Sequence, residues 1–261
     1  MPEDILLLKF SGPVAEVTFN KPSKLNAIDR ELAEELVGAF SAIEQNREVK
    51  AVIVRGAGRA FMAGGDLKTF HDAGEQAPEA VKKLIVPFHR VIRSIRELRA
   101  PVIAAVHGAV AGGGLALALA CDFVIASSDA VFTPAYLKIG TNPDGGTTWS
   151  VPRLLGERRA LEWLLLGDPM SAEKAAGLGL INRVVAREDF EQSVQGFANR
   201  LATGPAQAQA SLKRLIWSAR GSSLEDQLDA EADGFTAMAS TADFREGVAA
   251  FFERREPRFG K

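Results

Sequence analysis

The sequence predicts an α/β core followed by a helical C-terminal region. Short apolar runs that suit buried strands alternate with helical patterns as far as about Val185, and this alternation is typical of α/β layering. Beyond Glu188 the pattern is helical throughout. With 261 residues, of which 47% are hydrophobic and 25% charged, the chain has the composition of a globular protein with a large core.

The N-terminal elements are predicted from turn residues and from apolar spacing. Two strands, Ile5–Phe10 and Val14–Phe19, are separated by the turn Ser11-Gly12-Pro13. Asp29 stands at the expected N-cap of a helix, because apolar residues follow it at helical spacing from Leu32 to Ile43. The chain therefore opens with a hairpin and then a helix.

The middle of the chain continues the alternation. The β-branched run Val49–Val54 predicts a strand, and the glycine-broken segment Gly56–Gly65 predicts a loop. A helix is expected over Glu79–Leu98, with Pro87 as a kink or break. Three short apolar elements follow: a strand at Pro101–Val106, a helix at Gly114–Ala120 and a strand at Phe123–Ala126.

The C-terminal part is predicted as four helices, because Gly, Pro or Ser/Thr residues interrupt the apolar pattern between them. These helices are Phe190–Ala202, Pro205–Ser218, Leu224–Met238 and Phe244–Arg254. We therefore divide the chain into a core of residues 1–195 and a helical region of residues 196–261.

Composition excludes several classes of protein. The 31 basic and 33 acidic residues give a net charge of −2, which provides no overall attraction to nucleic acid or to an anionic membrane. A single cysteine, Cys121, excludes an intramolecular disulfide and a cysteine-based zinc site, and the three histidines lie too far apart for a local metal motif. The apolar run Ala100–Ala126 is broken by glycines, so we interpret it as core rather than as a membrane span. The acidic N-terminus carries no targeting signal, and we expect a cytoplasmic protein.

Two glycine-rich turns carry the strongest chemical signal. Ala60–Leu67 and Val110–Gly114 each place glycines just before a probable helix start, and neither fits a P-loop or a dinucleotide fingerprint. Two such turns can direct two backbone N–H groups at one point, which is the arrangement of an oxyanion hole. Each donor of this kind is typically worth about 3–4 kcal/mol, and glycine leaves the approach of a substrate carbonyl open.

Together with other motifs in the same order, these turns resemble the crotonase (enoyl-CoA hydratase/isomerase) superfamily from about residue 5 to 258. The other motifs are Asn20-Lys21-Pro22, Leu25-Asn26-Ala27, Pro101–Gly108, Cys121-Asp122, Pro143-Asp144-Gly145-Gly146 and Arg245–Val248. The resemblance implies the ClpP/crotonase-like fold of stacked ββα turns, with a C-terminal helical region that forms homotrimers, often doubled to hexamers. It also implies acyl-CoA thioester substrates and no metal or redox cofactor, since coenzyme A enters with the substrate.

The resemblance also implies site residues. The backbone N–H groups of Gly65 and Gly113 are the expected oxyanion donors. Residues expected to bind the CoA ester are Lys24, Leu25, Ala27, Ala63, Gly64, Gly65, Asp66, Leu67, Lys68, Gly113 and Tyr136. Residues that we place on the wall of the acyl pocket are His89, Ala116 and Trp149.

Two departures from the hydratase pattern decide the expected chemistry. The hydratases resembled here use two glutamates to activate water, and this chain has Ala116 and Tyr136 at those positions. Asp144 stands where members that resemble isomerases carry an acid that moves a proton along the acyl chain. We therefore expect an isomerase that shifts a carbon–carbon double bond, or a related ring isomerisation, with Asp144 as its only base.

Four alternatives remain at this point. The chain could be an enoyl-CoA hydratase, or it could resemble 4-chlorobenzoyl-CoA dehalogenase, with Asp144 as nucleophile and His89 at the position of a catalytic histidine. It could be an acyl-CoA-binding relative without catalysis. It could also bind RNA through the basic helix Lys82–Arg99, although at net charge −2 we favour a solvated or subunit-facing surface and expect no nucleic-acid or membrane partner.

Overall fold

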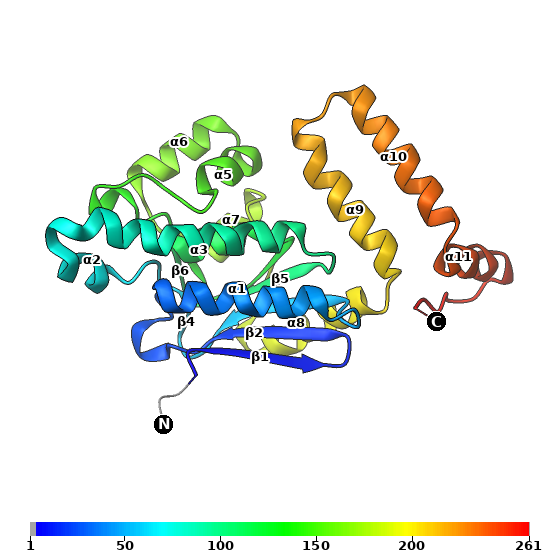
Figure 1. Ribbon diagram of the computed structural model, residues 1–261, viewed down its shortest axis with the longest axis horizontal. Coiled ribbons are helices and arrows are strands. Elements are labelled where there is room, and N and C mark those ends of the chain that lie inside the picture. Colours follow the sequence, from blue (N-terminus) through cyan, green and yellow to red (C-terminus); the bar gives the residue numbers. More distant parts are fainter. Residues whose placement is uncertain (1–3, 261) are drawn as a thin grey trace.

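The computed structural model describes residues 4–260, which form two β-sheets, surrounding helices and a helical arm that projects from one side (Figure 1). The larger sheet contains, in spatial order, β1 (Leu6–Ser11), β2 (Val14–Phe19), β3 (Ala51–Gly56), β5 (Val102–Val106), β7 (Phe123–Ser127) and β10 (Arg183–Val185). The smaller sheet contains, in order, β4 (Ala60–Met62), β6 (Ala109–Ala111), β8 (Val131–Thr133) and β9 (Met170–Ser171). The predicted α/β class is confirmed.

The larger sheet begins with the predicted hairpin, in which β1 and β2 pair antiparallel with Leu6 opposite Phe19. All further neighbours in this sheet pair in parallel. Every residue of β5 is buried, as expected for a strand covered on both faces. This explains why β5 reads in the sequence as a continuous apolar run.

The smaller sheet brings the two glycine-rich turns together. β4 lies inside the segment 56–65, so the prediction of a plain loop there was wrong, because a strand of three residues carries too little periodicity to be detected. β4 pairs in parallel with β6, with Met62 opposite Val110. Each glycine turn directly follows one of these strands, so the pairing places the turns side by side.

Helices α1 (Arg30–Gln45) and α3 (Ala77–Glu97) pack against each other beside the sheets. The side chain of Asp29 accepts a hydrogen bond from the Leu32 N–H at 3.0 Å, which confirms the predicted N-cap. α3 continues through the buried Pro87, so the predicted interruption does not break the helix. The short α2 (Leu67–Ala73) precedes α3.

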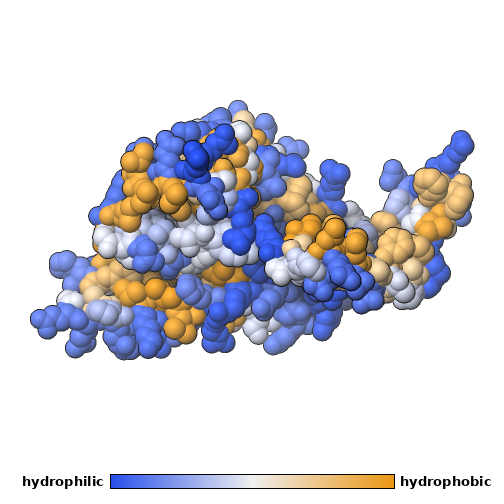
Figure 2. Space-filling view, turned by 90° about the horizontal axis from the view of Figure 1, so that it is seen from above, coloured by the Kyte–Doolittle hydropathy of each residue, from blue (hydrophilic) through white to orange (hydrophobic). Residues whose placement is uncertain are grey.

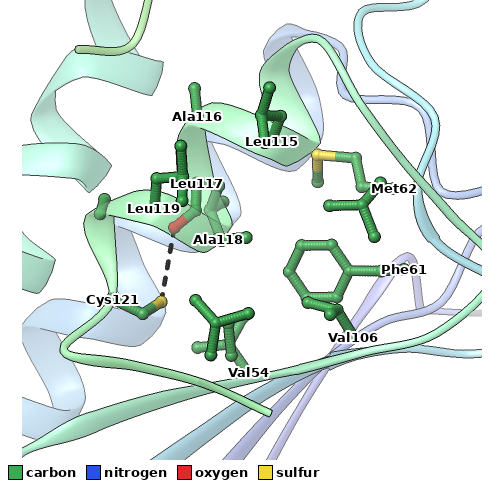
Figure 3. Packing of buried hydrophobic residues seen from close by; sticks show 14 of the residues in the cluster. Val54, Phe61, Met62, Val106, Leu115, Ala116, Leu117, Ala118, Leu119 and Cys121 are labelled. Atoms are coloured by element: carbon green, nitrogen blue, oxygen red, sulfur yellow. Dashed lines mark hydrogen bonds between the residues drawn. The ribbon is translucent and has the colours of Figure 1, made fainter. Parts of the chain in front are cut away.

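Helix α4 (Gly113–Ala120) is buried along its whole length, and a helix that is apolar on all sides belongs in a core. In Figure 3, side chains from the sheets, including Phe61 and Val106, face this helix. The Cys121 thiol at its end donates to the Leu117 carbonyl at 3.4 Å, and burial raises the pKa of this thiol. Cys121 is therefore an inert core residue.

The remaining helices of the core lie on different faces. Helices α5 (Thr147–Leu155), α6 (Glu157–Leu166) and α7 (Ala172–Gly177) follow the smaller sheet in the chain. α8 (Phe190–Ala202) packs on the larger sheet, where Phe190 and Val194 join a cluster with Ile53 and Ile103. The predicted division between residues 195 and 196 falls inside α8, and it stays a prediction. The short 3-10 helices are η1 (Pro22–Lys24), η2 (Gly74–Gln76), η3 (Leu137–Ile139), η4 (Arg187–Asp189) and η5 (Ala219–Gly221).

The projecting arm consists of α9 (Ala206–Ser218), α10 (Leu224–Ala239) and α11 (Ala242–Glu253), close to the predicted bounds. Figure 2 shows apolar side chains on this part of the molecule, where Phe251 and Phe252 are each 78% exposed. Within residues 4–260, no helix combines the length and apolar character that a membrane crossing requires. No group of three or more His, Cys, Asp or Glu side chains in the same range is placed to hold a metal ion.

Candidate active site

The two glycine turns are in van der Waals contact. A Cβ atom on Gly112 would lie 3.6 Å from the Cα of Gly64, and a Cβ on Gly64 would lie 3.4 Å from the Ala111 carbonyl oxygen. Both glycines have positive φ, +109° at Gly64 and +48° at Gly112, which residues with a side chain rarely adopt. The site therefore requires glycine at both positions.

The N–H groups of Gly65 and Gly113 are the two donors that we expected at this contact. Ile28 is hydrogen-bonded to the residues on either side of Gly65. Its N–H donates to the Gly64 carbonyl and its carbonyl accepts from the Asp66 N–H, each at 2.8 Å. Gly113 is the first residue of α4, where a helix leaves its N–H groups unpaired. Among residues 4–260, neither N–H has a hydrogen-bond partner. They can therefore serve as an oxyanion hole.

Aromatic rings lie close to both donors. A Cβ on Gly65 would lie 3.4 Å from Cε2 of Phe70, and one on Gly113 would lie 3.8 Å from Cζ of Phe88. A Cβ on Gly113 would also lie 3.4 Å from the Ile28 side chain. The surroundings of the donors are thus apolar, which strengthens their interaction with a developing negative charge.

The loop that carries Asp144 packs onto the same part of the molecule. A Cβ on Gly145 would lie 2.6 Å from the Cβ of Ala116 and 2.8 Å from Cε1 of Phe88. The Phe88 ring therefore borders both Gly113 and the residue after Asp144. The Gly145 N–H donates to Nε2 of His89 at 3.2 Å, so this histidine supports the Asp144 loop from α3.

Asp144 is held by two neighbouring side chains. The Tyr136 hydroxyl donates to Oδ1 of Asp144 at 2.9 Å. The Thr147 hydroxyl and N–H donate to the Asp144 backbone carbonyl at 2.9 and 3.0 Å. Burial, and then the charge of Asp144, raise the pKa of Tyr136 above its usual value near 10, so the tyrosine stays a neutral donor. The Tyr136 hydroxyl contacts Asp144 and lies 3.5 Å from the Thr147 hydroxyl, and the expected role of Tyr136 in substrate binding stays a prediction.

The segment expected along the CoA chain is fixed by Asn26. Its side-chain amide donates to the Ala57 and Ala60 carbonyls at 2.9 and 2.7 Å, and its Oδ1 accepts from the Lys21 N–H at 2.9 Å. Leu25 and Asn26 both have positive φ, a conformation that these three hydrogen bonds hold in place. The Leu25 carbonyl accepts from the Ala63 N–H at 3.0 Å, which joins this segment to the first glycine turn.

The two lysines expected at the CoA phosphates are exposed and paired with acids. Lys24 lies 3.3 Å from Asp66, and Lys68 lies 2.5 Å from Asp72. Asp66 also caps α2 by accepting from the Lys68 N–H at 3.1 Å. Ala27 and Ala63 are half-buried and Leu67 is half exposed, beside these charges. Contact of this group with a CoA ester stays a prediction.

Trp149, which we placed on the pocket wall, has its ring contacts elsewhere. Its ring centroid lies 6.0 Å from that of Trp217 in α9. The guanidinium groups of Arg153 and Arg220 lie 4.5 and 4.6 Å from its centroid. Trp149 thus joins α5 to the projecting arm, and a second role as pocket wall stays a prediction.

Comparison with known proteins decides the family. Residues 9–261 match the family model described as enoyl-CoA hydratase/isomerase. The chain belongs to the enoyl-CoA hydratase/isomerase family. This confirms the predicted superfamily and its fold, and it makes the protein an acyl-CoA enzyme of this family.

Relatives of this family member carry different chemistries. It is 38% identical over 257 residues to 1,2-epoxyphenylacetyl-CoA isomerase of Escherichia coli strain K12, with 98% of both proteins covered. It is 34% identical over 241 residues to 4-chlorobenzoyl coenzyme A dehalogenase-2 of Arthrobacter sp, and this alignment covers 91% of this chain and 87% of that protein. The solved structure of an enoyl-CoA hydratase from Polaromonas sp. JS666 matches with a TM-score of 0.94 and 38% identity, covering 98% of this chain and 99% of that chain. Family membership therefore leaves the reaction to be argued from the site.

Several residues of this enoyl-CoA hydratase/isomerase site were missed in the sequence. Phe70 and Phe88 look like ordinary apolar positions of helices, and Thr147 looks like a helix start. Their roles depend on contacts between distant segments, which spacing does not show. Asn26 gave a usable signal, because a polar residue inside a recognised motif is a candidate for holding a loop by side-chain hydrogen bonds.

Proposed function

We propose that this enzyme shifts a carbon–carbon double bond in an enoyl-CoA thioester, with Asp144 as the single proton carrier. The observation that carries the proposal is the Phe88 ring, which borders both the donor residue Gly113 and Gly145, the neighbour of Asp144. A base and an oxyanion hole that act on the same acyl group are what an isomerisation through an enolate requires.

The proposed reaction needs no group beyond these residues and the substrate. Asp144 takes a proton from C2 of a 3-enoyl thioester, and the electron pair moves onto the carbonyl oxygen. The N–H groups of Gly65 and Gly113 stabilise the resulting dienolate. The protonated Asp144 then returns the proton to C4, the carbonyl re-forms, and the double bond lies between C2 and C3. No atom is gained or lost.

The geometry around Asp144 supports a single-base mechanism. Tyr136 occupies Oδ1, and among residues 4–260 no hydrogen bond reaches Oδ2, so Oδ2 is the oxygen that we assign to proton transfer. At position 116, where the hydratase pattern expects a glutamate, Ala116 is 2% exposed and packed against Gly145. Neither Ala116 nor Tyr136, at the two positions of the hydratase pattern, carries a carboxylate. The two glutamates that would activate water for addition are therefore missing at these positions.

The test is the rate of Asp144→Asn on a 3-enoyl-CoA. Asparagine keeps the size and accepts the Tyr136 hydrogen bond, but it cannot accept the substrate proton. We expect kcat to fall by about 10²- to 10⁴-fold, the typical contribution of a positioned general base. Formation of the 2-enoyl product can be followed directly by its conjugated absorbance.

Asp129→Asn is the matched control, because Asp129 pairs with Arg187 at the surface and does not contact the site. We expect its rate to stay within about twofold of the native rate, within the range of ordinary surface substitutions. An unchanged rate in Asp144→Asn would exclude Asp144 as the base. Addition of water to a 2-enoyl-CoA by the native enzyme would contradict the argument from Ala116 and Tyr136.

The position of His89 supports a second candidate, a dehalogenase-type displacement. His89 lies beside Asp144 through the Gly145 N–H, and the Arthrobacter relative is named for that reaction. In that reaction, Asp144 attacks the halogen-bearing ring carbon of an aroyl-CoA and expels halide. Water then hydrolyses the aryl ester to a phenol and regenerates the carboxylate. Chloride release from 4-chlorobenzoyl-CoA, lost in Asp144→Asn, would favour this candidate over the isomerase.

The remaining assignments are proposals of the same kind. We place the CoA moiety along Leu25, Ala27 and the turn Ala63–Lys68, with Lys24 as a further phosphate contact. No metal or redox cofactor is needed, because coenzyme A arrives with the substrate. The exposed apolar side chains of the arm support a homotrimer, or a hexamer of two trimers, as the working assembly.

A further inference from the structure

Arg96, in the last turn of α3, contacts three other helices. Its Nη2 donates to the Leu119 carbonyl of α4 at 2.8 Å and to the Ser150 hydroxyl of α5 at 3.3 Å. Its guanidinium carbon lies 3.4 Å from the ring centroid of Trp217 in α9 and 5.4 Å from that of Trp149 in α5. One side chain therefore connects α4, α5 and the first helix of the arm.

Both core helices that Arg96 contacts carry the site at their N-terminal ends: on α4 Arg96 binds the opposite end, and on α5 it binds Ser150 in the same first turn as Thr147. α4 begins at the donor Gly113, and Arg96 binds its last turn, where a positive charge is favourable to the helix dipole. α5 begins at Thr147, which holds the Asp144 carbonyl. The spacing between the oxyanion donor and Asp144 therefore depends on how α4 and α5 lie relative to each other.

The arm holds Arg96 from the opposite side. Asp122 accepts from Lys213 at 2.7 Å and from Trp217 Nε1 at 3.1 Å, and both donors belong to α9. The same carboxylate accepts from the Val102 N–H at 2.8 Å, which joins it to β5. The Trp217 indole is thereby fixed to the core with its face against Arg96.

The carboxylate of Asp122 offsets part of the charge of Arg96, but burial outweighs it. Nη1 of Arg96 is buried and has no hydrogen-bond partner among residues 4–260. Burial lowers the pKa of Arg96 to about 10, so the guanidinium remains charged at neutral pH. The face of an indole ring stabilises a desolvated cation electrostatically, and removal of the Trp217 ring would leave the Arg96 cation without that support.

We infer that Arg96 is a positioning residue that sets the relative placement of α4 and α5, and that Trp217 of the arm holds Arg96 in place. Where an experiment measures turnover, this inference rests on the proposed function. It has a functional consequence, because docking of the arm then contributes to the rate although the site residues described above all precede α9.

The kinetic test compares Trp217→Phe with Trp217→Leu, and Arg96→Lys with Arg99→Lys. Phenylalanine keeps an aromatic face for the cation, whereas leucine of similar size does not. Arg99 is the matched control, because its hydrogen bonds go to Glu44, at 2.9 Å to Oε1 and 3.1 Å to the carbonyl, and not to the site helices. We expect Trp217→Leu and Arg96→Lys to lower kcat roughly tenfold with KM within about twofold, and the other two variants to keep most of kcat.

A merely structural role gives a different result. In that case thermal stability falls in Trp217→Leu and Arg96→Lys, but kcat per folded enzyme stays at the native value. That outcome, or equal kcat values for Trp217→Phe and Trp217→Leu, would overturn the inference.

A binding readout separates this inference from the proposed function. The chain has three tryptophans, so Trp163→Phe leaves Trp149 and Trp217, both beside Arg96, as the only indoles. Saturation of this variant with butyryl-CoA is expected to change its indole emission, and Arg96→Lys in the same background is expected to reduce the change at least fivefold at unchanged affinity. If the native enzyme turns over no enoyl-CoA but this emission result holds, the proposed function fails and the positioning role stands. Emission that butyryl-CoA does not alter, or that Arg96→Lys does not affect, contradicts the positioning role.

Discussion

Ala116 occupies the part of the site wall that the loop after Asp144 covers. The Gly145 backbone, at φ +58°, approaches it so closely that even a methyl group on Gly145 would overlap the Ala116 side chain at 2.6 Å. A larger residue at position 116 therefore meets the Asp144 loop and the Phe88 ring. The packing around Ala116 therefore suits a small side chain and not a glutamate.

We predict that Ala116→Glu does not create a hydratase. Overpacking typically costs about 1–3 kcal/mol, and burial of an unpaired carboxylate adds to this, so the melting temperature is expected to fall. Ala116→Gln is the control, because it adds the same bulk without the charge. The measurements are thermal unfolding and water addition to a 2-enoyl-CoA. Efficient hydration by Ala116→Glu would show that the loop moves aside readily and that our account of this wall is wrong.

Single residues of the site could be predicted from the sequence to different degrees. Gly65, Gly113 and Asp144 stand in short motifs whose order along the chain carries the information. The hydrogen bond between Tyr136 and Asp144 does not follow from their spacing of eight residues, because it depends on how η3 and the Asp144 loop fold back. Arg96 and Trp217 lie still farther apart in the chain, and only the packing of α9 brings them together.

At the scale of elements, α1 has an N-terminus that is held by charge as well as by its cap. Asp29 accepts from the Leu32 N–H and forms an ion pair with the buried Lys21. Burial alone would raise the pKa of Asp29, but the hydrogen bonds from Lys21 and Leu32 outweigh it and lower that pKa below 3.8. A carboxylate whose pKa is lowered in the folded state stabilises the fold above the unfolded pKa, and this contribution is lost as the pH falls through the folded value.

We predict that, as the pH falls from about 5 to about 3, the free energy of unfolding decreases less in Asp29→Asn than in the native protein. Asparagine is also a good N-cap, so the helix start is retained and only the titrating charge is removed. The measurement is the free energy of unfolding from urea titrations at both pH values. Equal losses in the two proteins would mean that Asp29 does not contribute to acid unfolding.

Helices long enough to repeat their apolar spacing over several turns were predicted well, and the short strands of the smaller sheet were not. The four C-terminal helices have the predicted positions to within two residues because each contains several turns between clear breaks. The strands of the smaller sheet have two or three residues each and gain their stability from neighbouring strands. Their existence is a tertiary property, so none of them could be predicted from the sequence.

At the scale of the whole molecule, the arm exposes several large apolar side chains. Leu224 is 76% exposed, and Phe251 and Phe252 are exposed to a similar degree. Patches of this kind mark interaction sites, and with α9 docked to the core through Asp122 the arm presents them in a fixed direction.

We predict that the double variant Phe251→Ser/Phe252→Ser weakens the trimer that we propose, and that it shifts sedimentation at micromolar concentration toward a monomer. Removal of two large apolar side chains from a buried contact costs several kcal/mol in total, at about 25 cal/mol per Å². Val86→Ser on α3 is the control, because Val86 is an exposed apolar residue, at 54%, outside the arm. A native protein that sediments as a monomer under the same conditions would contradict the proposed assembly.

The larger sheet has one property that bears on how the protein is made. Its strands lie side by side in the order in which they occur in the chain, so each new strand finds its neighbour already synthesised as the polypeptide leaves the ribosome. The sheet can thus grow by addition at one edge, without waiting for later segments. Trp217 is made more than a hundred residues after β5, so the contact between α9 and Arg96 forms only after all strands of the larger sheet have been made. The newly made chain then acquires its architecture first, and we expect it to reach its full rate only when the arm docks.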